Sequence, residues 1–276
     1  MLSLRDGVRG VVADVDGEAP YGLNLSEASP ARVYDYLLGG KDNFAVDRAE
    51  GERIRALMPG VEIGVRAQRA VLGRVVRFLV GEVGLRQLID IGTGLPTAEN
   101  VHQVAHSVDP EVRVAYVDND PHVLVHARAL LARNVNTLAV RADLREPAAL
   151  MADRELSAHV DLKRPVGLIL CGILHHIQDE DDPWHITKQL VAALPPGSYV
   201  FIHHLLNLGD EQSRNLLEAR TTRYRTKDEI ARFFVGLEMI EPGLVGVPDW
   251  RPDPEQHFQD DHPVLRLAVA GVGRKP

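Results

Sequence analysis

Apolar positions divide the chain into a helical first part and a second part in which strands and helices alternate. Helical spacing of apolar residues predicts three helices in the first part, over 31–38, 46–58 and 61–83. The first follows Ser29 and Pro30, where a serine can cap a helix and a proline can occupy its first turn. Residues 1–28 carry no such pattern, and we interpret them as a loose amino-terminal arm.

From residue 85 onward, short apolar runs predict strands at 85–91, 112–117, 137–140, 166–171 and 198–203. The segments between and after these runs predict helices at 97–107, 121–134, 147–156, 183–194 and 210–219. Strands separated by helices of this length pair in parallel through right-handed crossovers. The apolar run at 166–170 is typical of a strand that is buried on both faces. The pattern therefore predicts an α/β fold with a doubly wound, mostly parallel sheet.

The carboxyl end breaks this alternation. Thr226 and Glu229 form a capping-box pattern that predicts a helix through Phe234. Two strand-like segments follow, at 237–247 and 264–269, and no helical pattern lies between them. Because strands without a crossover helix pair antiparallel, we expect the last strands of the sheet to be antiparallel.

Composition and charge narrow the class of protein. The 276 residues include 31 basic and 39 acidic side chains, and the net charge of −8 at pH 7 excludes a basic nucleic-acid binder of the usual kind. Cys171 is the one cysteine, which excludes a disulfide framework and indicates a reducing cytosol. With no apolar run long enough to span a bilayer and no signal-peptide pattern, we expect a cytoplasmic protein. The expected organisation is a helical accessory segment or lid at 29–84, followed by one sheet domain at 85–276.

Glycines and acids lie where the predicted strands end. Asp90, Gly92 and Gly94 belong to the run DIGTG after the first strand, while Asp118 and Asp143 follow the second and third. Because ligands bind at the carboxyl edge of open α/β sheets, this combination predicts a nucleotide site. For each acid alone, the alternative is a helix or turn cap.

Two common nucleotide fingerprints do not fit the glycine run. Pro96 and Thr97 break the G-x-G-x-x-G pattern of dinucleotide-binding folds. A P-loop is excluded because no Gly-Lys-Ser/Thr follows. The glycine run therefore indicates a nucleotide site only in combination with the acids at the strand ends.

Several runs resemble known motifs. The runs LIDIGTG, VDNDP and ADLR resemble motifs of class I S-adenosylmethionine-dependent methyltransferases, at 88–94, 117–121 and 142–145. The run ARVYDYLLGGKDNF at 31–44 resembles the opening signature of an actinobacterial S-adenosyl methyltransferase family, and VPDWRPD and AGVGRKP, at 247–253 and 270–276, resemble its closing segments. The resemblance covers the chain from about Pro30 to its end. It implies a Rossmann-like, seven-stranded sheet whose last strand is inserted antiparallel.

The resemblance also implies the cofactor, S-adenosyl-L-methionine, and a place for each of its parts. The methionine part would lie at the glycine turn with Asp90, Gly92 and Gly94. Asp118 would hold the ribose and Asp143 the adenine amino group. In this sequence Pro96 replaces the third glycine of the class.

Four further residues are implied to lie around the cofactor. Asn119 and Leu144 would flank the adenine ring. Cys171 and Gly172 match the substrate-facing segment of the class, where Gly172 would leave room for the sulfonium and the transferred methyl group.

Histidines are the candidates for proton transfer. Methyl transfer from a sulfonium is an in-line displacement, which requires alignment and, for a protonated nucleophile, a general base. Histidine suits that role because its pKa lies near neutral. His175 and His176 follow the fourth predicted strand, and we expect one of them to be the base. His203 and His204 follow the adjacent fifth strand.

Two alternatives exist for these histidines. In the first, one histidine of each pair would pack against its neighbours or form a hydrogen bond with the backbone, while the other would be solvated. In the second alternative they would bind zinc or iron together with Asp179 or Glu180. The acidic run 179–182 is otherwise expected to be the charged start of the helix at Pro183, because carboxylates favour the positive end of a helix.

The polar residues that surround the double glycine at 39–40 are candidates for a lid. We expect Tyr34, Lys41 and Asn43 to bind the cofactor and to shape the acceptor pocket. The alternative is a helix followed by an ordinary solvated turn, with the tyrosines in the core between the helices.

The sequence thus predicts an S-adenosylmethionine-dependent methyltransferase that acts on a small-molecule acceptor, with no nucleic-acid or membrane partner. A homodimer is included among the expected assemblies. One alternative is a module that binds S-adenosylmethionine without catalysis. Another is a nicotinamide-dependent oxidoreductase, which would require a complete glycine fingerprint and a Tyr-x-x-x-Lys pair, and the sequence has neither.

Overall fold

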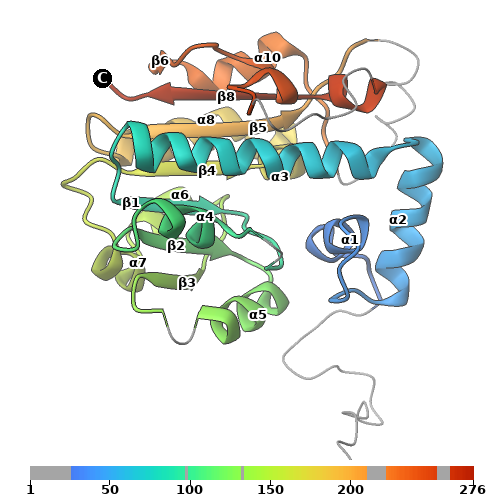
Figure 1. Ribbon diagram of the computed structural model, residues 1–276, viewed down its shortest axis with the longest axis horizontal. Coiled ribbons are helices and arrows are strands. Elements are labelled where there is room, and N and C mark those ends of the chain that lie inside the picture. Colours follow the sequence, from blue (N-terminus) through green and yellow to red (C-terminus); the bar gives the residue numbers. More distant parts are fainter. Residues whose placement is uncertain (1–25, 97–98, 132–133, 210–221, 254–261) are drawn as a thin grey trace, which may run out of the picture.

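The chain folds around one mixed sheet (Figure 1). The computed structural model describes residues 26–96, 99–131, 134–209, 222–253 and 262–276. The strands are β1 (Gln87–Ile91), β2 (Arg113–Asp118), β3 (Thr137–Arg141), β4 (Gly167–Cys171), β5 (Tyr199–Leu205), β6 (Glu238–Met239), β7 (Val245–Gly246) and β8 (Ala268–Arg274). Their order is β3-β2-β1-β4-β5-β8-β6, with β7 also paired to β8. The first five strands are parallel, and β8 is antiparallel to β5, β6 and β7.

Helices cover both faces of the sheet. One face carries α3 (Val61–Arg77), α4 (Val101–Val108) and α5 (Pro121–Leu131), and the other carries α6 (Pro147–Met151), α7 (Arg154–His159), α8 (Pro183–Ala193) and α10 (Lys227–Ala231). Strand residues alternate between the two cores: Leu88 packs toward α3, while its neighbour Ile89 packs toward α8. The prediction of a doubly wound, mostly parallel sheet is confirmed.

The first three helices form a connected unit that reaches the sheet. Helices α1 (Pro30–Leu37) and α2 (Ala45–Leu57) lie at one end of α3, which runs across the face of the sheet (Figure 1). The apolar face of α3 is buried in the same core as the strands, and Val71, Val75 and Val76 have no exposed surface. Helix α3 continues into a π-helical turn at Phe78–Glu82, close to the predicted end at residue 83.

Two predicted elements are interrupted in the structure. The helix expected at 147–156 is two helices, because the Asp153 side chain accepts the Leu156 N–H and starts α7. The strand expected at 237–247 is split into β6 and β7 around Pro242 and Gly243, since proline lacks an N–H and Gly243 has φ +88°. Within the described residues, this division gives the sheet eight strands rather than the expected seven.

The last strand begins later than expected. Residues 263–267 form a 3₁₀ turn, and β8 occupies 268–274 instead of 264–269. The expected antiparallel pairing holds, because Glu238 of β6 is in register with Arg274 of β8. The helix expected at 210–219 and most of the amino-terminal arm lie outside the described residues.

The predicted capping residues have different outcomes. Thr226 and Glu229 form the expected capping box at α10. Ser29 occupies the N-cap position of α1 but makes no side-chain cap. Its hydroxyl instead donates to Asp120 Oδ2 at 3.0 Å, in the loop after β2. A contact between distant segments has replaced the expected local one.

Candidate functional site

Four polar side chains lie on the α3 side of the sheet, near the carboxyl ends of four adjacent strands: Tyr116, Asp90, Cys171 and His203, which we call the α3-facing row. Asp90 is in register with Tyr116, and Cys171 with His203. Each lies two positions after an apolar residue of the core beneath α3. Asp90 and His203 are only 6% and 1% exposed. Because burial of polar groups is unfavourable without compensation, this row marks a candidate ligand site.

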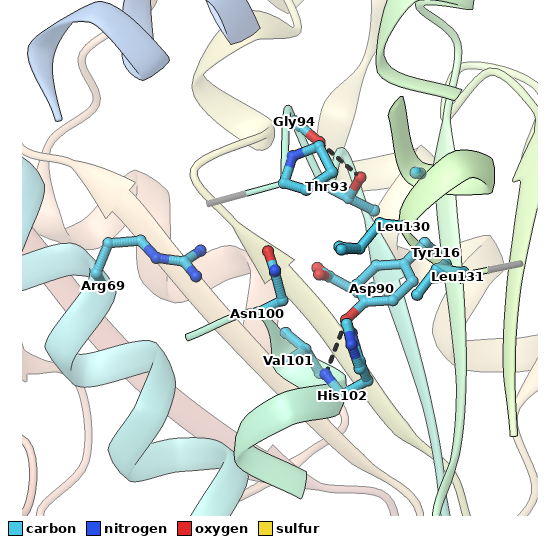
Figure 2. A pocket seen from close by; sticks show the side chains of 12 residues that line it. Arg69, Asp90, Thr93, Gly94, Asn100, Val101, His102, Tyr116, Leu130 and Leu131 are labelled. Atoms are coloured by element: carbon cyan, nitrogen blue, oxygen red, sulfur yellow. Dashed lines mark hydrogen bonds between the residues drawn. The ribbon is translucent and has the colours of Figure 1, made fainter. Parts of the chain in front are cut away.

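Arg69 of α3 points toward Asp90 across a small cavity beside the glycine turn (Figure 2). Burial raises the pKa of Asp90 to about 7, and the Arg69 guanidinium opposes that rise. Arg69 Nη2 donates to the Glu99 carbonyl at 2.7 Å. The Tyr116 hydroxyl accepts the His102 N–H at 2.7 Å and also pairs with the Nδ1 of that histidine. A charged helix residue and a buried carboxyl therefore face the same small space.

Gln68, the residue before Arg69, reaches the end of β4. Its Nε2 lies 3.7 Å from Cys171 Sγ, and a Cβ on Gly172 would lie 2.5 Å from that nitrogen. Tyr34 of α1 also lies within electrostatic reach of Arg69 and Cys171. Burial raises the pKa of Tyr34 above its usual range and that of Cys171 to about 12. Both groups are therefore uncharged at neutral pH.

The glycine turn after β1 needs both of its glycines. Gly92 and Gly94 have φ angles of +71° and +64°, in the left-handed region that favours glycine. A Cβ on Gly92 would lie 2.5 Å from the Ile173 side chain, whereas one on Gly94 would face open space. Gly92 is required by packing as well as conformation, and Gly94 leaves its backbone open to a ligand.

Asp118, at the end of β2, holds this turn. Its Oδ2 accepts the Gly94 N–H at 3.0 Å, and its Oδ1 accepts the Asp120 N–H at 2.9 Å. Burial raises the pKa of Asp118, and these two N–H groups oppose the rise. A carboxylate has about four acceptor positions, so the side chain can still accept a hydroxyl group.

Asp143, after β3, is already engaged with its neighbours. Arg145 donates to it from Nε at 3.0 Å and from Nη2 at 2.6 Å, and Asn119 Nδ2 lies 3.3 Å from its Oδ2. The Arg145 hydrogen bonds lower the pKa of Asp143 to about 2. Leu144 is buried beside it. Asn119 and Asp143, predicted at the adenine from separate strands, do come together.

The double-glycine turn is built around Asp35. This side chain accepts the Asp42 N–H at 2.9 Å and the Asn43 Nδ2 at 2.8 Å. A Cβ on Gly40 would lie 1.9 Å from its carboxylate. Lys41 is exposed. Of the three expected lid residues, Tyr34 is therefore the one that the structure brings to the α3-facing row, while the side chain of Asn43 closes the turn.

The segment with α1 and α2 docks on the loop that follows Asp118. Besides the Ser29 bond to Asp120, the Phe44 ring lies against the His122 ring, with centroids 5.8 Å apart. Asp120 follows Asp118 by two residues. The placement of α1 and α2 is thus tied to the end of β2.

The four candidate histidines form one cluster at the ends of β4 and β5. The rings of His176 and His204 lie 4.4 and 5.7 Å from that of His175. Burial lowers the pKa of His203 to about 4 and of His204 to about 3, and it lowers that of His175 well below its usual value. Arg225 Nη1 lies 2.9 Å from His204 Nε2, which must accept because arginine only donates. His176 is the half-buried member at the turn after β4.

The acidic run serves two purposes. Asp182 accepts the His185 N–H at the start of α8, as expected. Asp179 instead forms ion pairs with Arg223 at 2.7 Å and with Arg225 at 2.8 Å. Within the part of the chain that the structure describes, no three histidine, cysteine or acidic side chains are grouped to hold a metal ion.

The sequence matches the S-adenosyl methyltransferase family over residues 16–276. The chain belongs to this family. It is therefore an S-adenosylmethionine-dependent methyltransferase. A search of curated proteins found no match.

Two solved structures resemble this methyltransferase over nearly its whole length. A protein from Thermobifida fusca, provisionally described as a methyltransferase, is 41% identical with a TM-score of 0.87, over 93% of this chain and 98% of that one. A DUF574 family protein from Streptomyces avermitilis is 39% identical with a TM-score of 0.85, over 91% and 99%. The N-methyltransferase NodS from Bradyrhizobium japonicum, in complex with S-adenosyl-L-homocysteine, is 12% identical with a TM-score of 0.51, over 89% and 99%, and shares the fold.

The residues of the methyltransferase suit its cofactor. Gly94 leaves open space beside the backbone, and Asp118 presents carboxylate oxygens next to it. Asp90 is a buried carboxyl that shares a cavity with Arg69, so groups of both charges lie beside the glycine turn. No helix in the described ranges is long and apolar enough to cross a membrane.

Sequence reasoning missed Gln68 and Arg69. A signal was present, because Val61, Val65 and Leu72 define the buried face of α3, and positions 68 and 69 fall on that face at helical spacing. Polar residues within an apolar helical stripe indicate either a buried partner or a ligand.

Proposed function

We propose that this methyltransferase acts on a small-molecule acceptor held at the carboxyl ends of β4 and β5, beneath α1 and α3. The α3-facing row carries this proposal, because Cys171 and His203 are polar residues in register on neighbouring strands, and Gln68 of α3 reaches Cys171. When bound, S-adenosylmethionine supplies the methyl group and a neutral leaving group. The protein must then align the acceptor and exclude water.

The cofactor assignments follow the geometry of the sheet edge. Asp118 would accept the ribose hydroxyls with its remaining lone pairs. Asp143 and Asn119, held together, would receive the adenine edge, with Leu144 beneath the ring. The Arg145 hydrogen bonds keep Asp143 ionised, which supports an acceptor role toward an amino group.

Three side chains at the acceptor end of the site are uncharged at neutral pH. Tyr34 and Cys171 stay protonated at neutral pH, and His203 stays deprotonated. This environment favours an uncharged acceptor over a phosphate-rich one. The net charge of −8 also disfavours nucleic acid as an acceptor.

His176 is the better base of the predicted pair. His175 is 6% exposed, and burial holds its pKa well below neutral, which makes it a weak base. His176 is half-buried, so it can reach both an acceptor and solvent. The His175 ring would pack against the His176 ring and hold it in position.

A reducing cytoplasm suits this site. Cys171 is the one thiol, it lies in the site, and burial keeps it protonated and slow to oxidise. Residence in the cytoplasm would keep this thiol in its reduced form.

An acceptor screen scored by release of S-adenosylhomocysteine tests the function. We expect uncharged phenols, amines or thiols to be methylated and nucleic acids not to be. Once the acceptor is known, His176→Gln should lower kcat by roughly 10²- to 10⁴-fold at neutral pH, which is the usual contribution of a general base. His185→Gln, at an exposed histidine of α8, is the control. Full activity of His176→Gln would show that His176 is not the general base. Methylation of nucleic acid alone would refute the small-molecule acceptor.

A further inference from the structure

Arg225 is an arginine with only 1% of its surface exposed, beside the carboxyl ends of β4 and β5. Its carbonyl accepts the Asn207 N–H at 2.8 Å, which fixes its backbone just beyond β5. Each hydrogen on its two terminal nitrogens has an acceptor of its own. These acceptors are the Leu174 carbonyl at 3.0 Å, His204 Nε2 at 2.9 Å, the Ile177 carbonyl at 2.8 Å and Asp179 Oδ1 at 2.8 Å. Only the rigid fork of a guanidinium presents donors in this arrangement.

Three of these acceptors belong to the turn after β4. The carbonyls of Leu174 and Ile177 lie on either side of the two adjacent histidines, His175 and His176. The backbone N–H of Arg223 also donates to the His175 carbonyl, at 2.7 Å. The path of the turn is therefore set by a segment that follows it by about 50 residues in sequence.

The fourth acceptor connects the same guanidinium to the histidine rings. His204 Nδ1 lies 2.7 Å from the Leu205 carbonyl and must donate to it, while Nε2 accepts from Arg225. One neutral tautomer satisfies both contacts. The His175 ring lies between the other two, 5.7 Å from that of His204 and 4.4 Å from that of His176. Arg225 thus supports both the backbone and the rings around His176.

We propose that Arg225 is a positioning residue for methyl transfer: its guanidinium holds the turn after β4, so that the His176 ring keeps the distance and angle that proton transfer requires. The inference rests on the proposed role of His176 as the base and adds the residue that places it. Arg225 acts through His176 and does not touch the acceptor.

The surroundings of Arg225 suit a planar cation. Its guanidinium carbon lies 5.2 Å from the centroid of the Trp184 ring and 5.7 Å from that of Phe233, and these two rings stack on each other. A lysine would keep the charge, but its donors all lie on one nitrogen. It cannot reach both sides of the turn and His204 at once.

A purely structural role is the competing explanation, because removal of a buried charge partner lowers stability wherever it lies. The two explanations differ in what happens to folded molecules. Loss of stability alone leaves their kcat unchanged. Loss of positioning lowers kcat and leaves the affinities for the cofactor and the acceptor nearly as they were.

The variant Arg225→Lys tests the fork separately from the charge, with the acceptor found by the screen. We expect kcat to fall by roughly 10- to 100-fold, since a misplacement of about 1 Å can cost that much, with KM changed by less than about threefold. Arg232→Lys is the matched control, because Arg232 is exposed and lies over the same Trp184 ring at 4.0 Å. In a His176→Gln background, Arg225→Lys should cause little further loss, because it acts through that histidine.

Histidine ¹⁵N spectra give a second test that needs no acceptor. Burial lowers the pKa of His204, and the Arg225 charge lowers it further. Arg225→Met should therefore shift the protonation of His204 to higher pH. His203 is the internal control, because burial rather than Arg225 lowers its pKa.

The outcomes are distinct. Wild-type kcat in Arg225→Lys, additive losses in the double variant, or an unchanged titration of His204 in Arg225→Met would each overturn the positioning role and leave His176 as the base. Full activity of His176→Gln would instead refute the base itself, and the positioning role with it. Thermal unfolding of each variant confirms that it is folded.

Discussion

The backbone N–H of Gly94 donates to Asp118 Oδ2 at 3.0 Å across 24 residues of sequence. The carboxylate that fixes the glycine turn is therefore the one that we propose as the partner of the ribose. A ligand bound there would find the turn already in place, which reduces the ordering required on binding.

Substitutions of Asp118 distinguish these two roles. Asp118→Ala should lower the affinity for S-adenosylhomocysteine by about 100-fold, because it removes both the ribose acceptor and the support of the turn. Asp118→Asn keeps a carbonyl oxygen for the Gly94 N–H, so we expect a smaller loss of about 10-fold. Calorimetry measures both, with Glu111→Gln at an exposed carboxylate as the control. Unchanged affinity in Asp118→Ala would remove Asp118 from the site.

The two glycines of the turn should respond differently to alanine. Gly94→Ala should lower the free energy of unfolding by about 1–2 kcal/mol through its positive φ alone. Gly92→Ala should lower it by a further ~1–3 kcal/mol, because the new Cβ meets Ile173. Urea denaturation measures both. A double-mutant cycle with Ile173→Ala should show coupling at Gly92, and additivity there would contradict the packing explanation.

The stability of the protein should depend on pH through Asp90. Its pKa is raised from 3.8 to about 7. Between these values the folded state keeps a proton that the unfolded state has lost, so the free energy of unfolding falls as pH rises from about 4 to about 7. The full loss is on the order of 4 kcal/mol. Asp90→Asn should therefore be more stable, relative to wild type, at pH 8 than at pH 5, and a constant difference would argue against the shift.

The buried histidines should make the free energy of unfolding depend on pH in the opposite direction. Burial lowers the pKa of His203 from 6.5 to about 4. The unfolded state then takes up a proton first, so stability is lost as pH falls from about 6.5 toward 4, by roughly 3 kcal/mol for this residue. His203→Gln should lose less stability than wild type between pH 6.5 and 4 in urea denaturation. His185→Gln, at an exposed histidine, should behave as wild type, and an unchanged acid slope in His203→Gln would contradict the prediction.

Local patterns were enough to predict most of the architecture. The alternation of apolar runs and helical stripes predicted a doubly wound, mostly parallel sheet, because strands joined through helices pair in parallel through right-handed crossovers. Asp118 and Asp143 could be placed at one edge because parallel strands end on the same side.

The contacts between distant segments could not be predicted in this way. Ser29 bonds Asp120 across 91 residues, and nothing near Ser29 in sequence distinguishes this from a helix cap. The turn that holds His175 is contacted by Arg225, whose Nη1 donates to the Leu174 carbonyl from 51 residues later. The split of the strand at Pro242 and Gly243 was visible in the residue types, but the apolar run around them outweighed that signal.

The alternation of side chains along β1 has a consequence for folding fidelity. Asp90 faces α3, while Ile89 and Ile91 face the opposite core. A shift of one residue against β2 and β4 would turn the carboxyl into the apolar layer around Leu190 and would expose isoleucine to the cavity. The misaligned sheet would contain an uncompensated buried acid. A polar residue in the middle of β1 would thus penalise wrong strand alignment.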